Sequence, residues 1–242
     1  MLNQTTMKKI NSPFSLILVL TFVIFSFGQN TFVITDPLKD QGKLEIDSSI
    51  ERLIKKQVFP TVKSHWKEDY CPSGSEELAG VVKGAFTKSG STQTLILYQY
   101  CQTGNGLGNN ILVLFEDGKI IKTFGEESGW AITLRQLPDI NQNGIDEFSI
   151  TYGGGMHQGQ GGTGIDILEF VNGKPKVLGW LQESAFSEDD EYSYKVWVKK
   201  GKTPVFYREK YVTGSNDKLR KVGKATTFKL KKMEGEEFKI WK

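Results

Sequence analysis

Short apolar runs, separated by clusters of Gly, Asn and Asp, follow one another through most of this chain. Such runs are typical of β-strands, and such clusters are typical of turns. Asp117-Gly118 and Asn172-Gly173 supply the positive φ angles that tight hairpin turns need. The pattern predicts strands at residues 78–86, 94–101, 110–115, 120–124, 131–137, 147–152, 165–171, 176–181, 192–199, 205–212, 226–230 and 237–241, the last two forming a hairpin.

A segment before the first of these runs has helical periodicity instead. Its apolar residues recur at the spacing of one helix face: Ile50, Leu53, Ile54 and Val58. Ser48 or Ser49 is placed to cap this helix, and Pro60 is expected to end or kink it, with a short helical continuation through Trp66. The predicted fold class is mostly β, with antiparallel propeller-like or sandwich-like sheet modules and one N-terminal helix.

The chain also resembles itself at an offset of about 54 residues. This offset superimposes Gly90 on Gly144 and Tyr98 on Tyr152, and one further residue aligns the two hairpin turns. We therefore predict two repeat units, at roughly residues 78–130 and 131–182, each of a size typical of a four-stranded sheet module. The alternative is coincidence among glycine-rich turns.

The first 28 residues have the order of a secretory signal peptide. Lys8 and Lys9 precede an apolar run at 14–27, and small residues at Ser26 and Gly28 mark a cleavage site. We expect cleavage after Gly28 and export to the periplasm or the extracellular space. The alternative is an uncleaved membrane anchor, but a spanning helix needs about 20 apolar residues. Residues 29–46 are expected to be a flexible arm, and 47–242 a single β-rich domain that includes the helix.

Length and composition are those of an ordinary globular protein. The chain has 242 residues, of which 38% are hydrophobic, enough for one sizeable core. The formal net charge is +3, and loss of Lys8 and Lys9 with the signal peptide leaves +1 (3 − 2 = 1). This small charge predicts no nucleic-acid partner. After signal cleavage, no integral membrane segment is expected either.

Two cysteines, Cys71 and Cys101, lie in the exported part of the chain. An oxidising compartment would allow them to pair, so we predict a disulfide, which would stabilise the protein by about 3 kcal/mol. The alternative is two separate buried thiols.

Residues 139–147 have the residue pattern of a calcium loop. Oxygen-bearing side chains occupy alternate positions around Gly144, as the coordination of a hard cation requires. The candidate ligands are the side chains at loop positions 1, 3, 5 and 9 and the backbone carbonyl at position 7: Asp139, Asn141, Asn143, Glu147 and Ile145. The alternative is a metal-free turn in which Asp139 and Asn141 accept backbone N–H groups.

Residues 139–150, with the sequence DINQNGIDEFSI, resemble the calcium loop and following strand of FG-GAP or VCBS repeats. Those repeats build integrin-α-type β-propellers. The resemblance implies calcium bound by the five residues just named, and interaction with a protein or carbohydrate surface. Asn at positions 3 and 5 leaves two charged side-chain ligands, which implies weak calcium binding.

The glycine-rich segment 153–164 is unlike a phosphate-binding loop because a strand pattern, rather than a helix, follows it. We expect a flexible crossover loop, with His157 a lone exposed histidine. The acid pairs Asp146-Glu147 and Asp189-Asp190 are neighbours in sequence, so on a strand they would point to opposite faces. Aromatic residues of the later strands are expected either to bind sugar or peptide or to line the core: Tyr192, Tyr194, Trp197, Phe206, Tyr207 and Tyr211.

The function predicted from these features is an exported, non-catalytic binding or structural module with a calcium-stabilised loop. The alternative is a secreted hydrolase acting on glycan or ester substrates. Its acidic pair would be assembled across the glycine-rich segment, with His157 assisting.

Overall fold

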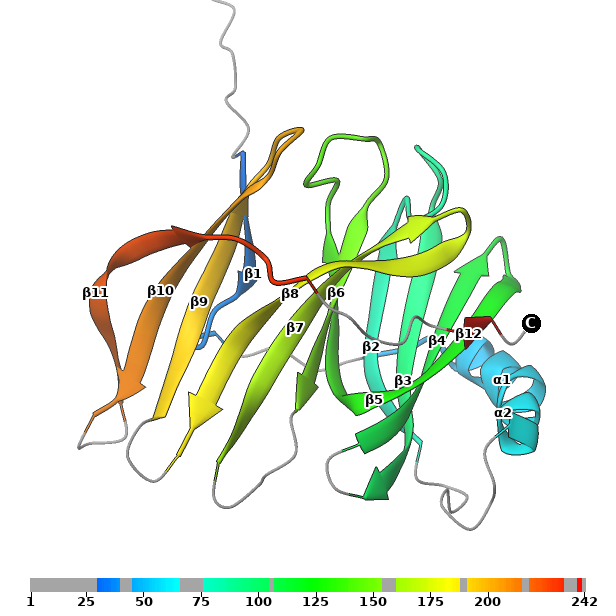
Figure 1. Ribbon diagram of the computed structural model, residues 1–242. Coiled ribbons are helices and arrows are strands. Elements are labelled where there is room, and N and C mark those ends of the chain that lie inside the picture. Colours follow the sequence, from blue (N-terminus) through cyan, green and yellow to red (C-terminus); the bar gives the residue numbers. More distant parts are fainter. Residues whose placement is uncertain are drawn as a thin grey trace, which may run out of the picture.

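The computed structural model describes residues 30–39, 45–65, 76–104, 107–153, 160–187, 191–214, 218–232 and 239–240, the last two by their backbone alone. The predicted signal peptide lies outside these residues. The described chain forms a 12-stranded sheet with two short helices, α1 and α2, at one end (Figure 1). The predicted fold class, mostly antiparallel β, is confirmed.

The strands from β2 to β11 follow one another across the sheet in chain order, each antiparallel to the next. At the two ends of the chain, β1 pairs with β9 and β12 pairs with β5. The elements are β1 Thr31–Thr35, α1 Ser48–Gln57, α2 Phe59–His65, β2 Glu77–Gly84, β3 Gln93–Gly104, β4 Leu107–Glu116, β5 Lys119–Leu137, β6 Glu147–Gly153, β7 Gly161–Val171, β8 Lys174–Phe186, β9 Glu191–Lys199, β10 Val205–Thr213, β11 Leu219–Phe228 and β12 Lys239–Ile240.

The two predicted hairpin turns are present between β4 and β5 and between β7 and β8. Asp117 has φ 49° and Gly118 has φ 75°, while Asn172 has φ 53° and Gly173 has φ 75°. Positive φ at both central residues is the conformation whose twist matches that of the flanking strands. The residue types at these turns therefore fixed the register of both hairpins.

One long strand, β5, replaces the two strands that the sequence predicted at 120–124 and 131–137. Its first part pairs with β4, and from Trp130 onward it pairs with β6. Gly129, between the two predicted strands, lies inside β5. A Cβ there would be 2.9 Å from the carbonyl oxygen of Gly153, so the glycine permits close approach of two strands. The backbone stays extended through Gly129, and only the pairing partner of β5 changes there, from β4 to β6.

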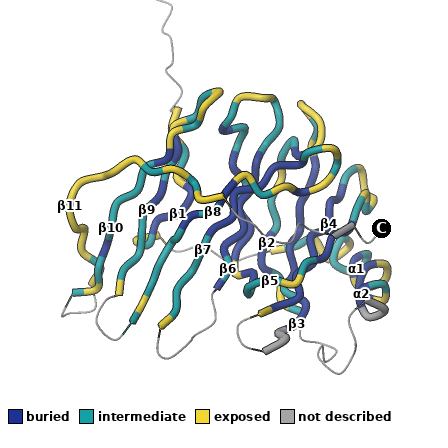
Figure 2. Tube along the Cα trace, in the orientation of Figure 1, coloured by how far each residue is buried: buried dark blue, intermediate teal, exposed yellow. Residues whose placement is uncertain are grey.

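The sheet folds over its own hydrophobic core along β5. Alternate residues of β3 belong to two different clusters, because both faces of this strand are buried. Leu95 and Leu97 join the central cluster with residues of β4 to β7, while Ile96 and Tyr98 pack under the helices. A third cluster lies farther along the sheet, where Ile34, Val196 and other apolar residues pack together. Figure 2 shows buried residues concentrated in β3, β4, β6 and β7, whereas β11 is exposed along most of its length.

The predicted helix is present as α1, with two refinements. Asp47, rather than Ser48 or Ser49, caps it, because its carboxylate accepts the Ser49 N–H at 2.8 Å. The helix breaks at Val58, and α2 begins at Phe59 as the predicted continuation. Pro60 falls in the first turn of α2, where its missing N–H would have had no partner within the helix. In the described residues, neither helix is long and apolar enough to cross a membrane.

Two segments, one near each end of the described chain, differ from the sequence prediction. The segment 29–46 was expected to be a flexible arm, yet residues 31–35 form β1, and Ile34 is fully buried. The predicted C-terminal hairpin is wrong, because β11 pairs with β10 while β12 pairs with Phe124 and Gly125 of β5. Both errors concern which partner a strand meets, and this depends on residues far away in sequence.

Candidate functional site

The predicted calcium loop joins β5 to β6, and its side chains fold back on its own backbone. The Asp139 carboxylate accepts the N–H of Asn143 at 2.9 Å and that of Gly144 at 3.1 Å. The Asn143 side-chain oxygen accepts the Ile145 N–H at 2.8 Å. These are the bonds of an Asx-rich turn, the alternative that the sequence left open.

Glu147, the predicted ligand at position 9, is fully buried beneath this loop. One carboxyl oxygen, Oε2, accepts the Ile140 N–H at 2.8 Å, while the other, Oε1, has no hydrogen-bond partner. The pKa of Glu147 is raised to about 7 by burial and by the nearby charges of Glu169 and Asp139, although the hydrogen bond from the Ile140 N–H lowers it. A buried carboxyl oxygen without a partner is costly, and either a bound proton or a cation would satisfy it.

Glu169, which the sequence analysis missed, reaches the loop from β7. Its Oε2 accepts the side-chain amides of Asn141 at 2.6 Å and of Asn143 at 2.7 Å. The sequence feature that could have identified Glu169 is an acidic residue within the apolar run of a predicted strand. Among the described residues, no group of three or more His, Cys, Asp or Glu side chains is arranged to hold a metal ion. The unpartnered Oε1 of Glu147 could bind a cation. The side-chain oxygens of Asp139 and Asn143 already accept backbone N–H groups, and they are not arranged around a common point where a cation could bind.

Asp146 and Glu147 bind different partners, although only Glu147 belongs to a strand, as the first residue of β6. The Asp146 carboxylate accepts the Ala85 N–H at 2.9 Å and the Gln136 side-chain amide at 2.8 Å. It therefore joins the β5–β6 loop to the end of β2. The other acid pair, Asp189-Asp190, lies outside the described residues.

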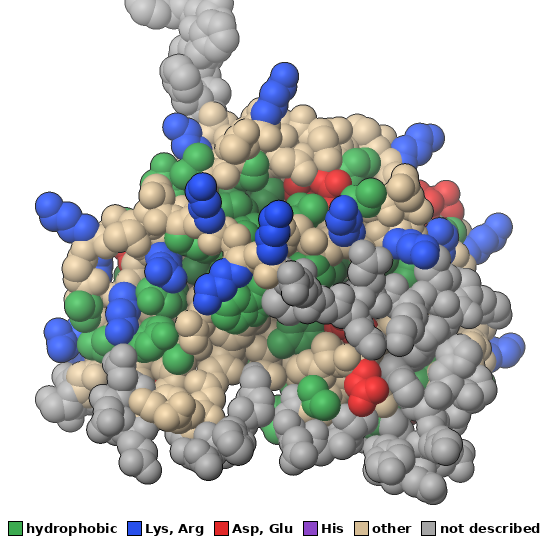
Figure 3. All heavy atoms as spheres, in the orientation of Figure 1, with side chains coloured by type: hydrophobic (Ala, Val, Ile, Leu, Met, Phe, Trp, Pro, Cys, Tyr) green, Lys and Arg blue, Asp and Glu red, His purple; other side chains and the backbone are tan. Residues whose placement is uncertain are grey.

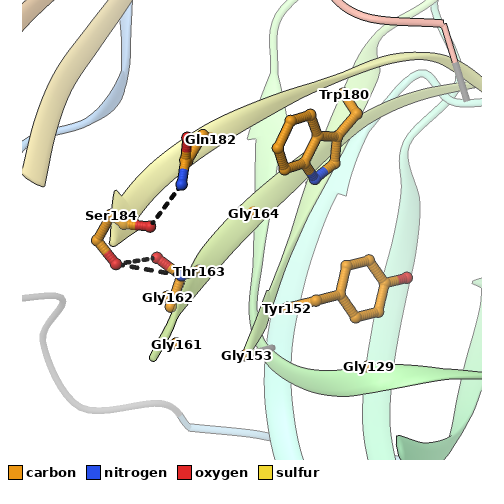
Figure 4. Close-up of a pocket in the computed structure, with 10 residues that line it drawn as sticks. All are labelled: Gly129, Tyr152, Gly153, Gly161, Gly162, Thr163, Gly164, Trp180, Gln182 and Ser184. Carbon is orange, nitrogen blue, oxygen red and sulfur yellow. Dashed lines mark hydrogen bonds between the residues drawn. The ribbon is translucent and has the colours of Figure 1, made fainter. Parts of the chain in front are cut away.

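A second candidate site is a cavity of about 340 Å³ on β5 to β8 (Figure 4). The rings of Tyr152 and Trp180 line it together with three polar side chains and a set of glycines. The polar residues are Thr163, Gln182 and Ser184, and the glycines are Gly129, Gly153, Gly161, Gly162 and Gly164. This volume is at the lower end of the range for small-molecule sites, so the cavity suits one sugar ring or a similar group.

Close packing of neighbouring strands explains why glycines occupy these positions of the cavity. A Cβ on Gly164 would overlap the Trp180 indole, lying 2.8 Å from its Cε2, and one on Gly162 would lie 3.0 Å from the Ala185 Cα. Gly161, Gly162 and Gly164 belong to β7, so the prediction of a flexible crossover loop over 153–164 is wrong for this part. Their lack of side chains lets β8 and its indole lie close on β7. His157 falls outside the described residues.

Tyr152 connects this cavity to a partly buried polar network. Its hydroxyl donates to Glu126 Oε1, which also accepts the Ser128 hydroxyl at 3.0 Å. Asn110 donates in turn to Ser128 at 3.0 Å. Burial raises the pKa of Glu126 to about 7, although the hydrogen bonds from Tyr152 and Ser128 lower it, and the charge of Asp166 adds to the rise.

Asp166 lies beside the cavity on the same face of β7 as Gly164. It is opposite Trp180 in the β7–β8 register and opposite Ile150 in the β6–β7 register. The residue is 9% exposed, and its Oδ1 has no hydrogen-bond partner. Burial raises its pKa to about 6. The sequence analysis missed Glu126, Tyr152 and Asp166 because they lie far apart in sequence and meet only through the pairing of β5, β6 and β7. An acid between Ile165 and Ile167 was a usable signal for Asp166.

The aromatic residues of β9 and β10 divide between core and surface. Phe206 and Tyr211 are buried, at 6% and 7% exposure. Trp197 stacks on Tyr207 with ring centres 5.6 Å apart and planes 5° apart, and Arg208 lies 4.7 Å from the Tyr194 ring centre. Most of these rings therefore already have a partner within the protein.

The two predicted disulfide cysteines are described unequally. Cys101 is buried in β3, where the Asn109 side-chain amide lies 3.4 Å from its sulfur. Cys71 lies outside the described residues, so the disulfide stays a prediction.

The charged surface can be followed in Figure 3, where Lys and Arg side chains stand apart from one another, with hydrophobic and other side chains between them. On this face they do not gather into one basic patch. The expectation of no nucleic-acid partner stays a prediction.

Comparison with protein-family models, with curated proteins and with solved structures finds no match for this chain. The resemblance of residues 139–150 to FG-GAP or VCBS repeats therefore stays a prediction from those residues alone.

Proposed function

We propose that this protein is an exported, non-catalytic module that binds carbohydrate in the cavity between Tyr152 and Trp180. The observation that carries the proposal is the composition of this cavity, in which two aromatic rings lie among polar side chains that can both donate and accept hydrogen bonds. Sugars present apolar C–H groups beside hydroxyls, and this combination of rings and polar groups is complementary to both.

The rings are held in place before any ligand binds. The hydrogen bond to Glu126 fixes the Tyr152 hydroxyl, and the Trp180 indole packs against Gly164, where a Cβ would lie 2.8 Å from its Cε2. Little side-chain entropy is therefore lost on binding, which favours affinity in a small cavity. Gln182 and Ser184, on β8 with Trp180, line the cavity as well and can donate or accept hydrogen bonds.

Binding of the mature chain to a glycan array tests this proposal. For a glycan that binds, Trp180→Ala is expected to lower the affinity at least about tenfold, because a ring that covers the ligand is lost. Gln182→Ala should lower it by a smaller factor, measured by calorimetry. Trp197→Ala is the control, since its ring stacks on Tyr207 and is not among the residues that line the cavity. Equal loss in Trp180→Ala and Trp197→Ala would contradict the proposal.

We also propose that calcium stabilises the β5–β6 loop without taking part in chemistry. The residues that would hold it are Asp139, Asn141, Asn143, the Ile145 carbonyl and Glu147, with Glu169 adjacent. The unpartnered Oε1 of Glu147 supports this proposal. When bound, the ion would supply positive charge for buried carboxylates and fix the turn.

Calcium at about 100 times its dissociation constant is expected to raise the free energy of unfolding by about 2.7 kcal/mol, measured as a shift in thermal unfolding between calcium and chelator. Glu147→Gln should abolish the shift, because it removes the buried charge while keeping an acceptor for the Ile140 N–H. Asp117→Asn, in an exposed turn, should keep the shift. Identical unfolding of the unmodified protein in both buffers would leave the loop as a plain turn.

A second candidate function, a secreted hydrolase of glycan or ester substrates, is favoured by one observation. Glu126 and Asp166 have raised pKa values beside the cavity, and a general acid must hold its proton near neutral pH. Turnover of chromogenic glycosides or esters that is lost in Glu126→Gln would establish hydrolysis. Binding without turnover would favour the module.

A further inference from the structure

We propose that the ligand of this cavity is a sugar with a protonated amine, whose ammonium group binds beside Asp166 and Glu126. This inference rests on the proposed carbohydrate binding and adds the chemical class of the ligand. Its basis is a pair of acids behind an aromatic cavity, with one carboxyl oxygen left without a partner.

No basic side chain of the described ranges neutralises either acid. The ion pairs found there join Lys55 to Glu51, Lys195 to Asp36 and Lys221 to Glu209. Glu126 is satisfied by neutral hydroxyl donors, and Asp166 Oδ1 is buried without any donor. An unpaired buried carboxylate is unfavourable, and a cationic ligand would supply both the charge and the hydrogen-bond donors it lacks.

The strand register places the unpartnered acid next to the cavity. Asp166 follows Gly164 by two residues, so both lie on one face of β7, and Asp166 faces Trp180 across the β7–β8 ladder. Glu126 meets the cavity through the Tyr152 hydroxyl. Neither acid is among the residues that line the cavity, so the amine would reach them beyond the Tyr152 ring, at the end where its hydroxyl meets Glu126.

The aromatic walls suit a cation as well as a sugar. Lys231, from the segment after β11, places its Nζ 5.1 Å from the centre of the Trp180 ring, which shows that the indole accepts a positive charge. The groups around the proposed amine site are thus Glu126 from β5, Tyr152 from β6, Asp166 from β7 and Trp180 from β8, with Lys231 beside the Trp180 ring. Lys231 carries the same charge as the ligand and would weaken its binding.

A matched pair of ligands tests the inference: a glucosamine oligosaccharide with free amines, and the fully N-acetylated oligosaccharide of the same length. Acetylation removes the charge and keeps the sugar rings. Near neutral pH, the cationic oligosaccharide is expected to bind at least about tenfold more tightly. This preference should fall as salt is raised, because part of it is electrostatic.

Substitutions test whether the preference for the cationic oligosaccharide depends on the two acids. Asp166→Asn is expected to bring the affinity ratio of the two oligosaccharides towards one, and Glu126→Gln should lower it by a smaller factor. Glu127→Gln, an exposed neighbour, should leave the ratio unchanged. If Asp166→Asn does not fold, the salt dependence and Glu126→Gln decide the question.

The outcomes separate the two proposals. If neither oligosaccharide binds and the glycan array is also negative, carbohydrate binding itself is wrong. If both bind equally, independently of salt, carbohydrate binding stands and the amine inference is overturned. A preference for the acetylated oligosaccharide, or a cationic preference that survives Asp166→Asn, overturns it as well.

Discussion

Gly80→Ala is expected to destabilise the protein by about 2 to 3 kcal/mol, because there is no space for a methyl group at this position. A Cβ on Gly80 would lie 2.5 Å from the Leu134 Cβ and 2.9 Å from the Leu134 backbone nitrogen. The second contact involves backbone, so a change of rotamer cannot relieve it. Urea denaturation of the variant should show a lower transition midpoint with an unchanged slope.

Gly201→Ala is the matched control. The nearest heavy atom to a Cβ at this position lies 3.8 Å away, an ordinary van der Waals distance. Its free energy of unfolding should stay within about 0.5 kcal/mol of the unmodified protein. Equal midpoints for the two variants would show that β2 and β5 do not pack closely. That result would contradict the close contact between Gly80 of β2 and Leu134 of β5.

Glu126→Gln is expected to stabilise the protein by about 3 kcal/mol at pH values above about 8, and to change it little below about pH 5. The pKa of Glu126 is raised from 4.5 to about 7 in the folded protein. Between these values the folded state holds a proton that the unfolded state has lost, so stability falls as pH rises through this window. Glutamine resembles the protonated acid, still accepts the Tyr152 hydroxyl, and removes this loss.

Chemical denaturation at the two pH values measures this effect, with the exposed Glu127→Gln as the control. Asp166, raised to about 6, and Glu147, raised to about 7, should leave part of the pH dependence in the Glu126→Gln variant. Asp36 has its pKa lowered below 3.8 by Lys195 and the Leu38 N–H, although burial opposes this, so its contribution is lost only in stronger acid. A variant less stable than the unmodified protein at high pH would contradict a Glu126 that holds its proton in the folded state.

The candidate loop shows how far a local pattern reaches. Asp139 and Asn143 lie in the turn between β5 and β6, and Glu147, the first residue of β6, is hydrogen-bonded to the backbone of that turn. Glu169 joins them only because β6 and β7 pair, and the residue lies on another strand. Likewise Glu126, Tyr152 and Asp166 come from three different strands, and their meeting has no signature at a fixed spacing.

The sequence by itself determined the antiparallel β class, most strand positions, the helix near Ile54 and the two tight hairpins. These depend on side-chain alternation and on the φ preference of a few residues, which neighbours in sequence decide. Tertiary structure alone decided that β5 runs through Gly129, that β1 and β12 pair with β9 and β5, and that Asp166 lies opposite Trp180. Partner choice and burial depend on the free energy of contacts between distant segments, which no local pattern contains.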